Sequence, residues 1–261
     1  MRAEIGIIGG TGVYDPKLLS DAKKVKMSTP YGEPSDDIVV GKLGGRKVAF
    51  VNRHGPGHKI PPHMVNYRAN IWALSQLGVT RVLAPTAVGS LADEYRPGDL
   101  VVPDQFIDRT YGRISTFYEK GRVCHISVAD PFCAELRRLL VQTCRKLGYV
   151  VHDKGTQVCI NGPRFSTRAE SVMFQKWGAH TINMTLVPEC ALAREMEMCY
   201  ASIAMVTDYD CWKEHNVTID EVIKRMKENE EKVKELLLRV IEGIPKERAC
   251  GCGSALAGAL I

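Results

Sequence analysis

The sequence predicts a single-domain α/β fold, and three observations support this class. Short apolar segments alternate with amphipathic helical patterns along the chain. Most apolar segments are continuous rather than alternating, which is typical of strands covered by helices on both faces. No serine- or glycine-rich linker and no internal repeat interrupts the 261 residues. We therefore expect one domain over residues 1–245 and a tail rich in Cys, Gly and Ala over residues 246–261.

The apolar segments give the expected strands. They lie at residues 4–8, 38–41, 47–51, 81–84, 100–102, 157–160, 181–184 and 201–207. Residues 20–27 are rich in lysine and are not predicted to form a strand.

Four helices are expected between these strands, at residues 65–78, 130–148 and 166–177 and from Thr218 onward. Pro131 opens the second helix and Gly148 closes it, which is the usual asymmetry of helix ends. Thr218 and Glu221 have the spacing of a capping box, which marks the start of the fourth helix.

Composition excludes several classes of protein. The 35 basic and 30 acidic residues are interspersed, as on a solvated surface, so a nucleic-acid groove is not expected. No apolar run reaches the roughly 20 residues of a membrane span, and the N-terminus lacks the pattern of a signal peptide. We therefore expect a cytoplasmic protein without a membrane or nucleic-acid partner.

The chain contains nine cysteines. Only Cys250 and Cys252 are closely spaced and no CxxC pair exists, so a structural zinc site is not expected. Buried free thiols are one interpretation. Disulfides in the cytosol of a hyperthermophile are the other, and composition does not choose between them.

Two polar loops follow expected strands in the first third of the chain. Gly9-Gly10-Thr11 offers backbone N–H groups and a hydroxyl to an anion, although a simple tight turn has the same composition. A dinucleotide-binding loop is disfavoured because the spacing is not GxGxxG. In the second loop, Arg53 and His54 precede His58, and an arginine fork suits bidentate binding of phosphate.

Two further loops add hydroxyls after strands. Thr86-Ala87 lies in the segment TAVGS, which is weak evidence alone but is consistent with a third anion-binding loop. Met184-Thr185 follows the segment at 181–184. Met184 is suited to pack against a sugar face and Thr185 to bind an anion, while a core methionine and a capping threonine are the alternative.

Two carboxylates end the very apolar strand at 201–207. Asp208 and Asp210 are two residues apart, so in an extended chain both point to the same side. Mutual repulsion and apolar surroundings raise the pKa of such a pair, and a protonated carboxyl can donate a proton to a leaving group. A solvated Asx turn is the alternative interpretation.

The order of these motifs resembles the methylthioadenosine phosphorylase branch of the purine nucleoside phosphorylase family. The resemblance covers residues 5–234 and depends on the series GGTG, RHGxxH, TAxGS, PDQFIDRT, GPRFSTRAES, NMTxVPE and TDYDCWKEH. It implies a single α/β domain with a twisted mixed β-sheet flanked by helices. It also implies a homo-oligomer, either a trimer or a dimer of trimers, with the active site near the subunit interface.

The resemblance also implies roles for individual residues. Those expected to bind phosphate are Thr11, Arg53, His54, Thr86, Ala87 and Thr185. Those expected to bind the nucleoside are His58, Phe165, Met184, Asp208 and Asp210, together with His125, which reaches the neighbouring subunit's 5'-methylthio pocket. Asp208 would act at N7 of the purine and Asp210 at its 6-amino group. No metal or redox cofactor is implied, and inorganic phosphate is the co-substrate.

The implied reaction is phosphorolysis of 5'-deoxy-5'-methylthioadenosine to adenine and 5-methylthioribose 1-phosphate, a step of purine and methionine salvage. Ser166 and Ile219 are expected to set selectivity for the 5' group, and an apolar Ile219 favours a thioether over a hydroxyl. A broader nucleoside phosphorylase acting on adenosine, inosine or methylthioinosine is the alternative. A phosphate-independent hydrolase and a non-catalytic purine-binding subunit are more distant ones.

Two departures from animal members of the family concern Asn161, which stands where a Glu is usual, and the short tail ending in the CxC of Cys250 and Cys252. This tail resembles that of hyperthermophilic archaeal members. The resemblance implies a Cys133–Cys199 disulfide and a redox-active or disulfide pair formed by Cys250 and Cys252.

Overall fold

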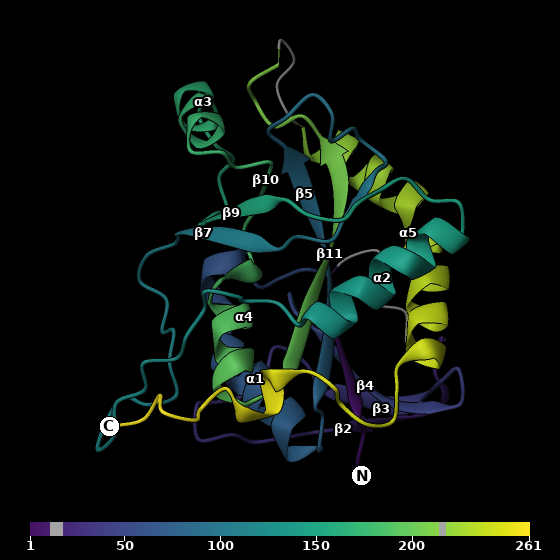
Figure 1. Ribbon diagram of the computed structural model, residues 1–261, viewed down its shortest axis with the longest axis vertical. Coiled ribbons are helices and arrows are strands. Elements are labelled where there is room, and N and C mark those ends of the chain that lie inside the picture. The colour runs from purple at the N-terminus through teal and green to yellow at the C-terminus, as the bar shows by residue number, and fades with distance from the viewer. Residues whose placement is uncertain (11–17, 214–217) are drawn as a thin grey trace.

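The computed structural model describes residues 1–10, 18–213 and 218–261 as one mixed β-sheet with helices on both faces (Figure 1). The expected α/β fold is therefore confirmed. Among the described residues, no helix has both the length and the apolar character needed to cross a membrane.

Eleven strands are found in the described residues. They are β1 (Ile5–Gly9), β2 (Ser20–Val25), β3 (Ile38–Leu43), β4 (Arg46–Asn52), β5 (Arg81–Ser90), β6 (Leu100–Val101), β7 (Gln105–Arg109), β8 (Val151–His152), β9 (Thr156–Ile160), β10 (Thr181–Asn183) and β11 (Cys199–Asp208). The main path through the sheet is β2-β3-β4-β1-β5-β10-β9-β7, and β11, β6 and β8 branch from β5.

The ten-residue strand β5 holds the two branches together. Along its length it pairs in parallel with β11, and at its start with β1 on the other side. At its far end, Gly89 and Ser90 pair instead with the antiparallel strand β10. Because β1, β4, β5 and β11 run parallel, their carboxyl ends meet at one edge, where α/β folds place ligands.

All eight predicted strand segments form strands, but three strands were missed. The prediction that residues 20–27 form no strand is wrong, because β2 lies at the edge of the sheet and exposes its lysines to solvent. Charged side chains are a common protection of such edges. Strand β7 is the half-exposed opposite edge, and β8 has only two residues. Neither carries a long apolar run.

Five α-helices are found in the same described residues. They are α1 (Tyr67–Gln76), α2 (Ala134–Lys146), α3 (Arg168–Lys176), α4 (Leu186–Glu195) and α5 (Ile219–Gly243). Figure 1 shows α1 and α4 on one side of the central strands and α2 and α5 on the other. The four predicted helices are confirmed, whereas α4 was not predicted because it is apolar on most sides and contains Pro188.

The caps of two helices can be compared with the sequence. The structure contains a capping box at α3, where Thr167 accepts from the N–H of Glu170 and the Glu170 carboxylate accepts from the N–H of Thr167. At α5, the carbonyl of Thr218 accepts from Val222. The side chain of Glu221, the other half of the predicted box, lies outside the described residues.

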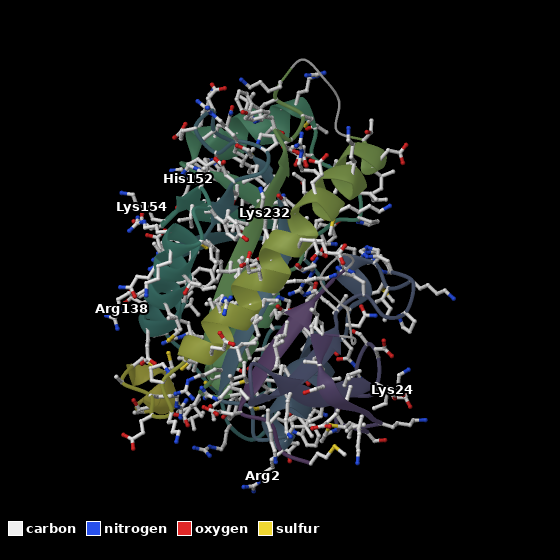
Figure 2. All side chains as sticks on the ribbon, turned by 90° about the vertical axis from the view of Figure 1, so that its right-hand side faces the viewer. Arg2, Lys24, Arg138, His152, Lys154 and Lys232 are labelled. Atoms are coloured by element: carbon white, nitrogen blue, oxygen red, sulfur yellow. The ribbon has the colours of Figure 1, made fainter. Side chains whose placement is uncertain are left out.

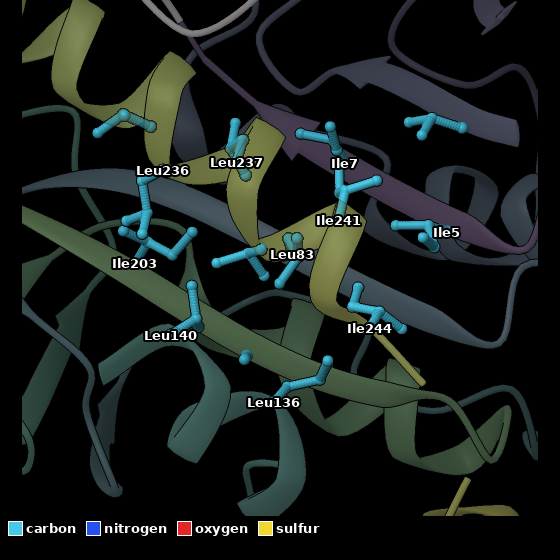
Figure 3. Close-up of a cluster of buried hydrophobic side chains, with 14 of the residues drawn as sticks. Ile5, Ile7, Leu83, Leu136, Leu140, Ile203, Leu236, Leu237, Ile241 and Ile244 are labelled. Carbon is cyan, nitrogen blue, oxygen red and sulfur yellow. The ribbon is translucent and has the colours of Figure 1, made fainter. Parts of the chain in front are cut away.

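The two layers of helices bury two apolar cores. On the α2 and α5 side, Leu136, Leu140, Leu237 and Ile241 pack against β1, β5 and β11 (Figure 3). Helix α5 crosses this face of the sheet diagonally, with Lys232 on its outer side (Figure 2). The second core lies under α1 and α4. Burial on both sides explains why the central strands are continuously apolar.

The C-terminal tail is ordered by specific contacts. The buried Arg81 pairs with Glu4 at 2.8 Å and donates to the carbonyl of Pro245 at 2.8 Å. Beyond the 3-10 helix Gly251–Ser254, the last residues pair with the segment around His125, whose N–H donates to the carbonyl of Ala259 at 2.8 Å. The tail is therefore part of the fold and links β5 to a distant loop.

Candidate active site

A cavity of about 550 Å³ opens at the carboxyl edge of the parallel strands. Its walls come from the ends of β1, β4, β5, β10 and β11 and from one side of α5. This volume lies in the usual range for small-molecule sites. The site residues placed in the cavity wall are Arg53, His54, His58, Thr86, Ala87, Phe165, Ser166, Met184, Thr185, Asp208, Asp210 and Ile219.

Arg53 and Glu189 form a fully buried ion pair at the cavity floor. The arginine Nε and Nη2 donate to the two carboxylate oxygens at 2.7 and 2.8 Å. Its Nη2 also donates to the carbonyl of Ile8, and its Nη1 to that of Pro85. Burial alone would lower the pKa of Arg53, but the carboxylate of Glu189 raises it overall.

This geometry corrects the expected role of Arg53. The fork that was expected to hold an anion bidentately is occupied by Glu189. Among the described residues, four of the five guanidinium N–H groups have acceptors, and one on Nη1 has none there. Arg53 therefore contributes a fixed positive charge and a single donor.

His54 and His58 stack on each other beside this pair, with ring centroids 4.1 Å apart. The Nδ1 of His54 lies 2.9 Å from the carbonyl oxygen of Ile60, so Nδ1 carries the proton. Burial, together with the Arg53 cation, lowers the pKa of His54 to about 4, and burial also lowers the pKa of His58. At neutral pH His54 is uncharged and its Nε2 is a hydrogen-bond acceptor.

The predicted hydroxyl loops converge on the same region. The Oγ1 atoms of Thr86 and Thr185 are 3.5 Å apart, although the residues come from β5 and from the turn after β10. Gly10 lines the cavity next to them. Thr11, the remaining predicted hydroxyl, lies outside the described residues.

Asp208 and Asp210 lie together in the cavity wall, but not through the extended chain that the spacing predicted. Asp210 has a left-handed φ of 48°, and its N–H donates to Asp208 Oδ1 at 2.8 Å. This is an Asx turn, which was the alternative interpretation. The turn is enclosed rather than solvated, since Asp210 is 5% exposed.

The two carboxyl groups have different surroundings. Burial raises the pKa of Asp210, and hydrogen bonds from Ser171 and Cys211 only partly oppose this shift. Thr207 donates to Asp208 Oδ2 at 2.6 Å. The protonated form of Asp210 is therefore favoured above the pH at which an exposed aspartate ionises, and a protonated carboxyl is a hydrogen-bond donor.

Strand β5 needs a glycine at position 89, beside these carboxyl groups. A Cβ at this position would lie 3.0 Å from Asp208 Oδ1 and 3.3 Å from the Cβ of Asp210. A larger residue would displace the turn. Gly89, the glycine of the TAVGS segment, therefore leaves space for the two carboxyl groups rather than forming part of an anion-binding loop.

A second wall of the cavity is largely apolar. It combines Met184 and the partly exposed ring of Phe165 with a stripe along the start of α5. The members of this stripe are Ile219, Val222, Ile223 and Met226. Among described residues, the buried hydroxyl of Ser166 has no hydrogen-bond partner.

Close packing also fixes Met184. Gly162 has a φ of 61°, and a Cβ there would lie 2.5 Å from the Met184 sulfur. The Arg113 Nη2 donates to the carbonyls of Met184 and Asn161 at 2.9 and 2.8 Å. The side-chain oxygen of Asn161 accepts from Arg113 as well, at 3.3 Å, so the residue that departs from the animal sequence helps to hold this wall.

Three functional candidates were missed from the sequence. Glu189 fixes Arg53, and Ser171 holds Asp210, but both lie in helices whose roles show only after folding. Asn183 is buried in the cavity wall, and among the described residues neither atom of its amide has a hydrogen-bond partner. The position of Asn183 directly before Met184 is the sequence signal that could have indicated a role in the site.

One predicted residue is not brought to the cavity. His125 is exposed on the loop paired with the C-terminal tail and does not line the cavity of this chain.

Neutralising Glu189 should be costly because it would leave the Arg53 charge buried without its counterion. We expect Glu189→Gln to lower the free energy of unfolding by about 3–5 kcal/mol, measured by chemical denaturation. The matched control is Glu228→Gln, which removes an exposed partner of Arg225 and should change stability by less than about 1 kcal/mol. Equal effects of the two substitutions would contradict this role for the pair.

Comparisons with known proteins identify the family of this chain. The family model described as the phosphorylase superfamily matches residues 4–242. The S-methyl-5'-thioadenosine phosphorylase of Thermofilum pendens is 58% identical over 260 residues, covering 100% of this chain and 99% of the relative. That of Hyperthermus butylicus is 57% identical over 265 residues, covering 100% and 97%.

Solved structures show the same fold. A methylthioadenosine phosphorylase from an antarctic soil metagenomic library superposes with a TM-score of 0.95 at 44% identity, covering 100% of this chain and 93% of the other. The Schistosoma mansoni methylthioadenosine phosphorylase in complex with adenine gives 0.93 at 41% identity, covering 99% of each chain. Sequence and structure agree over the full length, and this chain belongs to the phosphorylase superfamily.

Proposed function

We propose that this chain is a cytoplasmic enzyme that cleaves 5'-deoxy-5'-methylthioadenosine with inorganic phosphate, releasing adenine and 5-methylthioribose 1-phosphate. The observation that carries this proposal is one cavity lined by anion-binding groups, a carboxyl pair and an apolar wall. The relatives at 57–58% identity are named S-methyl-5'-thioadenosine phosphorylases. The reaction needs no redox or catalytic metal cofactor.

The carboxyl pair is suited to the leaving purine. As the glycosidic bond breaks, negative charge develops on the base, and a donor at N7 stabilises it, while an acceptor at the 6-amino group holds the base in place. Asp208 is assigned to N7 and Asp210 to the 6-amino group. Burial raises the pKa of Asp210, and the Asx turn fixes the separation of the two carboxyls.

The anion-binding groups are suited to phosphate. The hydroxyls of Thr86 and Thr185, the N–H of Ala87 and the remaining Nη1 donor of Arg53 are assigned to phosphate, because these residues line one cavity and the two hydroxyls lie 3.5 Å apart. Thr11 is assigned to the same group from its position in the sequence. Fixed donors of this kind align the nucleophile before the reaction, and the phosphate charge stabilises the cationic sugar.

The remaining walls favour the methylthio nucleoside. Phe165 and Met184 offer apolar surfaces to the base and sugar, and the α5 stripe beginning at Ile219 offers no polar partner to a 5'-hydroxyl. The Schistosoma mansoni relative is described as an adenosine/methylthioadenosine phosphorylase. Adenosine is therefore the most informative competing substrate. Ser166 is the residue whose hydroxyl is suited to bind the 5'-hydroxyl of adenosine.

A substrate panel tests this proposal directly. We expect phosphate-dependent release of adenine from methylthioadenosine to be fastest, adenosine to be slower and inosine to be slowest. Asp208→Ala should lower kcat by about 10²–10⁴-fold because the developing charge on the purine loses its partner. Unchanged thermal unfolding would show that this variant is folded.

Three outcomes would contradict the proposal. Inosine as the best substrate would indicate a 6-oxopurine enzyme. Release of free methylthioribose without phosphate would indicate a hydrolase. Full activity of Asp208→Ala would remove the assigned role of this carboxyl.

The protonation of His54 predicts how the site selects its anion. Since Nε2 accepts a hydrogen bond, an anion touching it must carry a proton, which hydrogen phosphate has at pH 7 and sulfate lacks. We expect sulfate to inhibit with a Ki at least about tenfold above the KM for phosphate, the effect of one missing hydrogen bond. In His54→Gln the side-chain amide can donate a hydrogen bond to sulfate, so the ratio of the Ki for sulfate to the KM for phosphate should be smaller. Equal affinity for both anions in the unchanged enzyme would exclude this protonation state.

We also propose that the active enzyme is a trimer or a dimer of trimers in which His125 completes a neighbour's cavity. The support is a set of solvent-exposed apolar side chains near His125 in sequence, Tyr111, Ile114 and Val123, which are 75%, 50% and 52% exposed. Light scattering should therefore give a mass at least three times the 28.9 kDa of one chain. His125→Ala should raise the KM for methylthioadenosine without raising that for phosphate. A monomeric active enzyme would contradict both statements.

A further inference from the structure

Arg113 lies in the long segment between β7 and α2, and all five of its guanidinium N–H groups have protein acceptors. Its Nε donates to the side-chain oxygen of Asn161 at 3.3 Å, and its Nη2 donates to the carbonyls of Asn161 and Met184 at 2.8 and 2.9 Å. Its Nη1 donates to the hydroxyl of Tyr67 at 3.2 Å and to the carbonyl of Val187. A guanidinium has five such donors, so this side chain binds its neighbours with all of them and keeps none for a ligand.

The acceptors of Arg113 are all uncharged, in contrast to the carboxylate of Glu189 that binds Arg53. They are three backbone carbonyls, one amide oxygen and one hydroxyl. What this position uses is therefore the planar shape of the guanidinium rather than an ion pair. A lysine would keep the positive charge, but its single nitrogen cannot reach all of these acceptors at once.

Two of these acceptors lie on either side of Thr185 in the chain, the carbonyls of Met184 and Val187. Thr185 precedes α4, but its side chain makes no capping hydrogen bond to that helix. Its Oγ1 instead lies 3.5 Å from that of Thr86, in the cavity wall. Because Arg113 binds the backbone before and after Thr185, it fixes the direction of this hydroxyl and the place of Met184 together.

The contact with Tyr67 extends the same network to a third part of the cavity wall. The hydroxyl of Tyr67 accepts from Arg113 and donates to the carbonyl of Pro62 at 2.8 Å. Pro62 lines the cavity, two residues after Ile60, whose carbonyl binds the ring of His54. One side chain thus connects the wall assigned to the nucleoside with the loops assigned to phosphate.

We propose that Arg113 is a positioning residue for phosphorolysis, which sets the placement of the nucleoside relative to the attacking phosphate. This inference rests on the proposed function, in which Met184 faces the sugar and Thr185 binds phosphate. Attack at C1' needs the two co-substrates to be aligned, and a displacement of about 1 Å can slow a reaction by about 100-fold. Arg113 is not among the described residues that line the cavity, so its replacement should affect the reaction step more than the binding of either co-substrate.

The test compares Arg113→Lys with Arg137→Lys in the full-length enzyme. Arg137 is the matched control because its guanidinium also donates to backbone carbonyls, those of Val102, Pro103 and Asp153, which are not in the described cavity wall. We expect Arg113→Lys to lower kcat by about 10–100-fold, while the KM for methylthioadenosine and that for phosphate each change by less than about fivefold. Arg137→Lys should keep kcat within about twofold, even where its Tm falls.

Chemical rescue separates a positioning role from a loss of stability. In Arg113→Ala, guanidinium chloride at concentrations far below those that unfold the protein should restore part of the lost kcat, because the free cation can bind the same acceptors. Sodium chloride at the same concentration should not. Each rate is measured well below the Tm of its variant, so that the loss of folded enzyme does not contribute.

Two results would overturn the positioning role of Arg113. One is an unchanged kcat of Arg113→Lys when the wild-type enzyme is active. The other is an equal loss of kcat in the Arg113 and Arg137 variants, without rescue by guanidinium. A wild-type enzyme that releases no adenine from methylthioadenosine and phosphate would instead contradict the proposed function, so the two failures are distinguishable.

Discussion

The buried pair of Arg53 and Glu189 is the interaction on which the arrangement of the site depends. One guanidinium joins the end of β4 to α4 through the carboxylate, and to the carbonyls of Ile8 on β1 and Pro85 on β5. A buried ion pair adds little net stability, because desolvation offsets most of its attraction. The pair instead fixes the positions of these strands and of α4 relative to one another. The polar loops that follow these strands are held at one level, so groups distant in sequence face a common space.

The sequence predicts the central fold well because the physical requirement there is simple. Strands such as Ile5–Gly9 and Cys199–Asp208 are buried on both faces and must be apolar throughout. The elements that were missed obey other rules. Strand Ser20–Val25 is an edge and tolerates lysines, and Leu186–Glu195 is a helix buried on most sides, which removes the amphipathic pattern that reveals a helix. Edges and fully buried helices are set by their neighbours rather than by their own periodicity.

The same distinction applies to the site. Residues at the ends of apolar strands, among them Thr86, Thr185 and Asp208, could be proposed from position alone, and the fold places them together. What they contact could not be inferred. The partner of Arg53 lies 136 residues away, and the cluster of Cys133, Cys199, Cys250 and Cys252 combines three separate segments, so no local spacing indicates either contact. Sequence patterns locate polar groups, while the partners of those groups are decided by topology.

The left-handed backbone at Asp210 limits which side chains this position accepts. At a φ of 48° most side chains are strained, but aspartate and asparagine are both accepted. An exchange between these two residues alters the hydrogen bonds offered to a purine, from a match for an amino group to a match for a keto group and its N–H. The backbone at this position therefore favours the two side chains that would offer a purine different hydrogen bonds. Under the role proposed for Asp210, an exchange between them changes how the base is recognised without straining the turn.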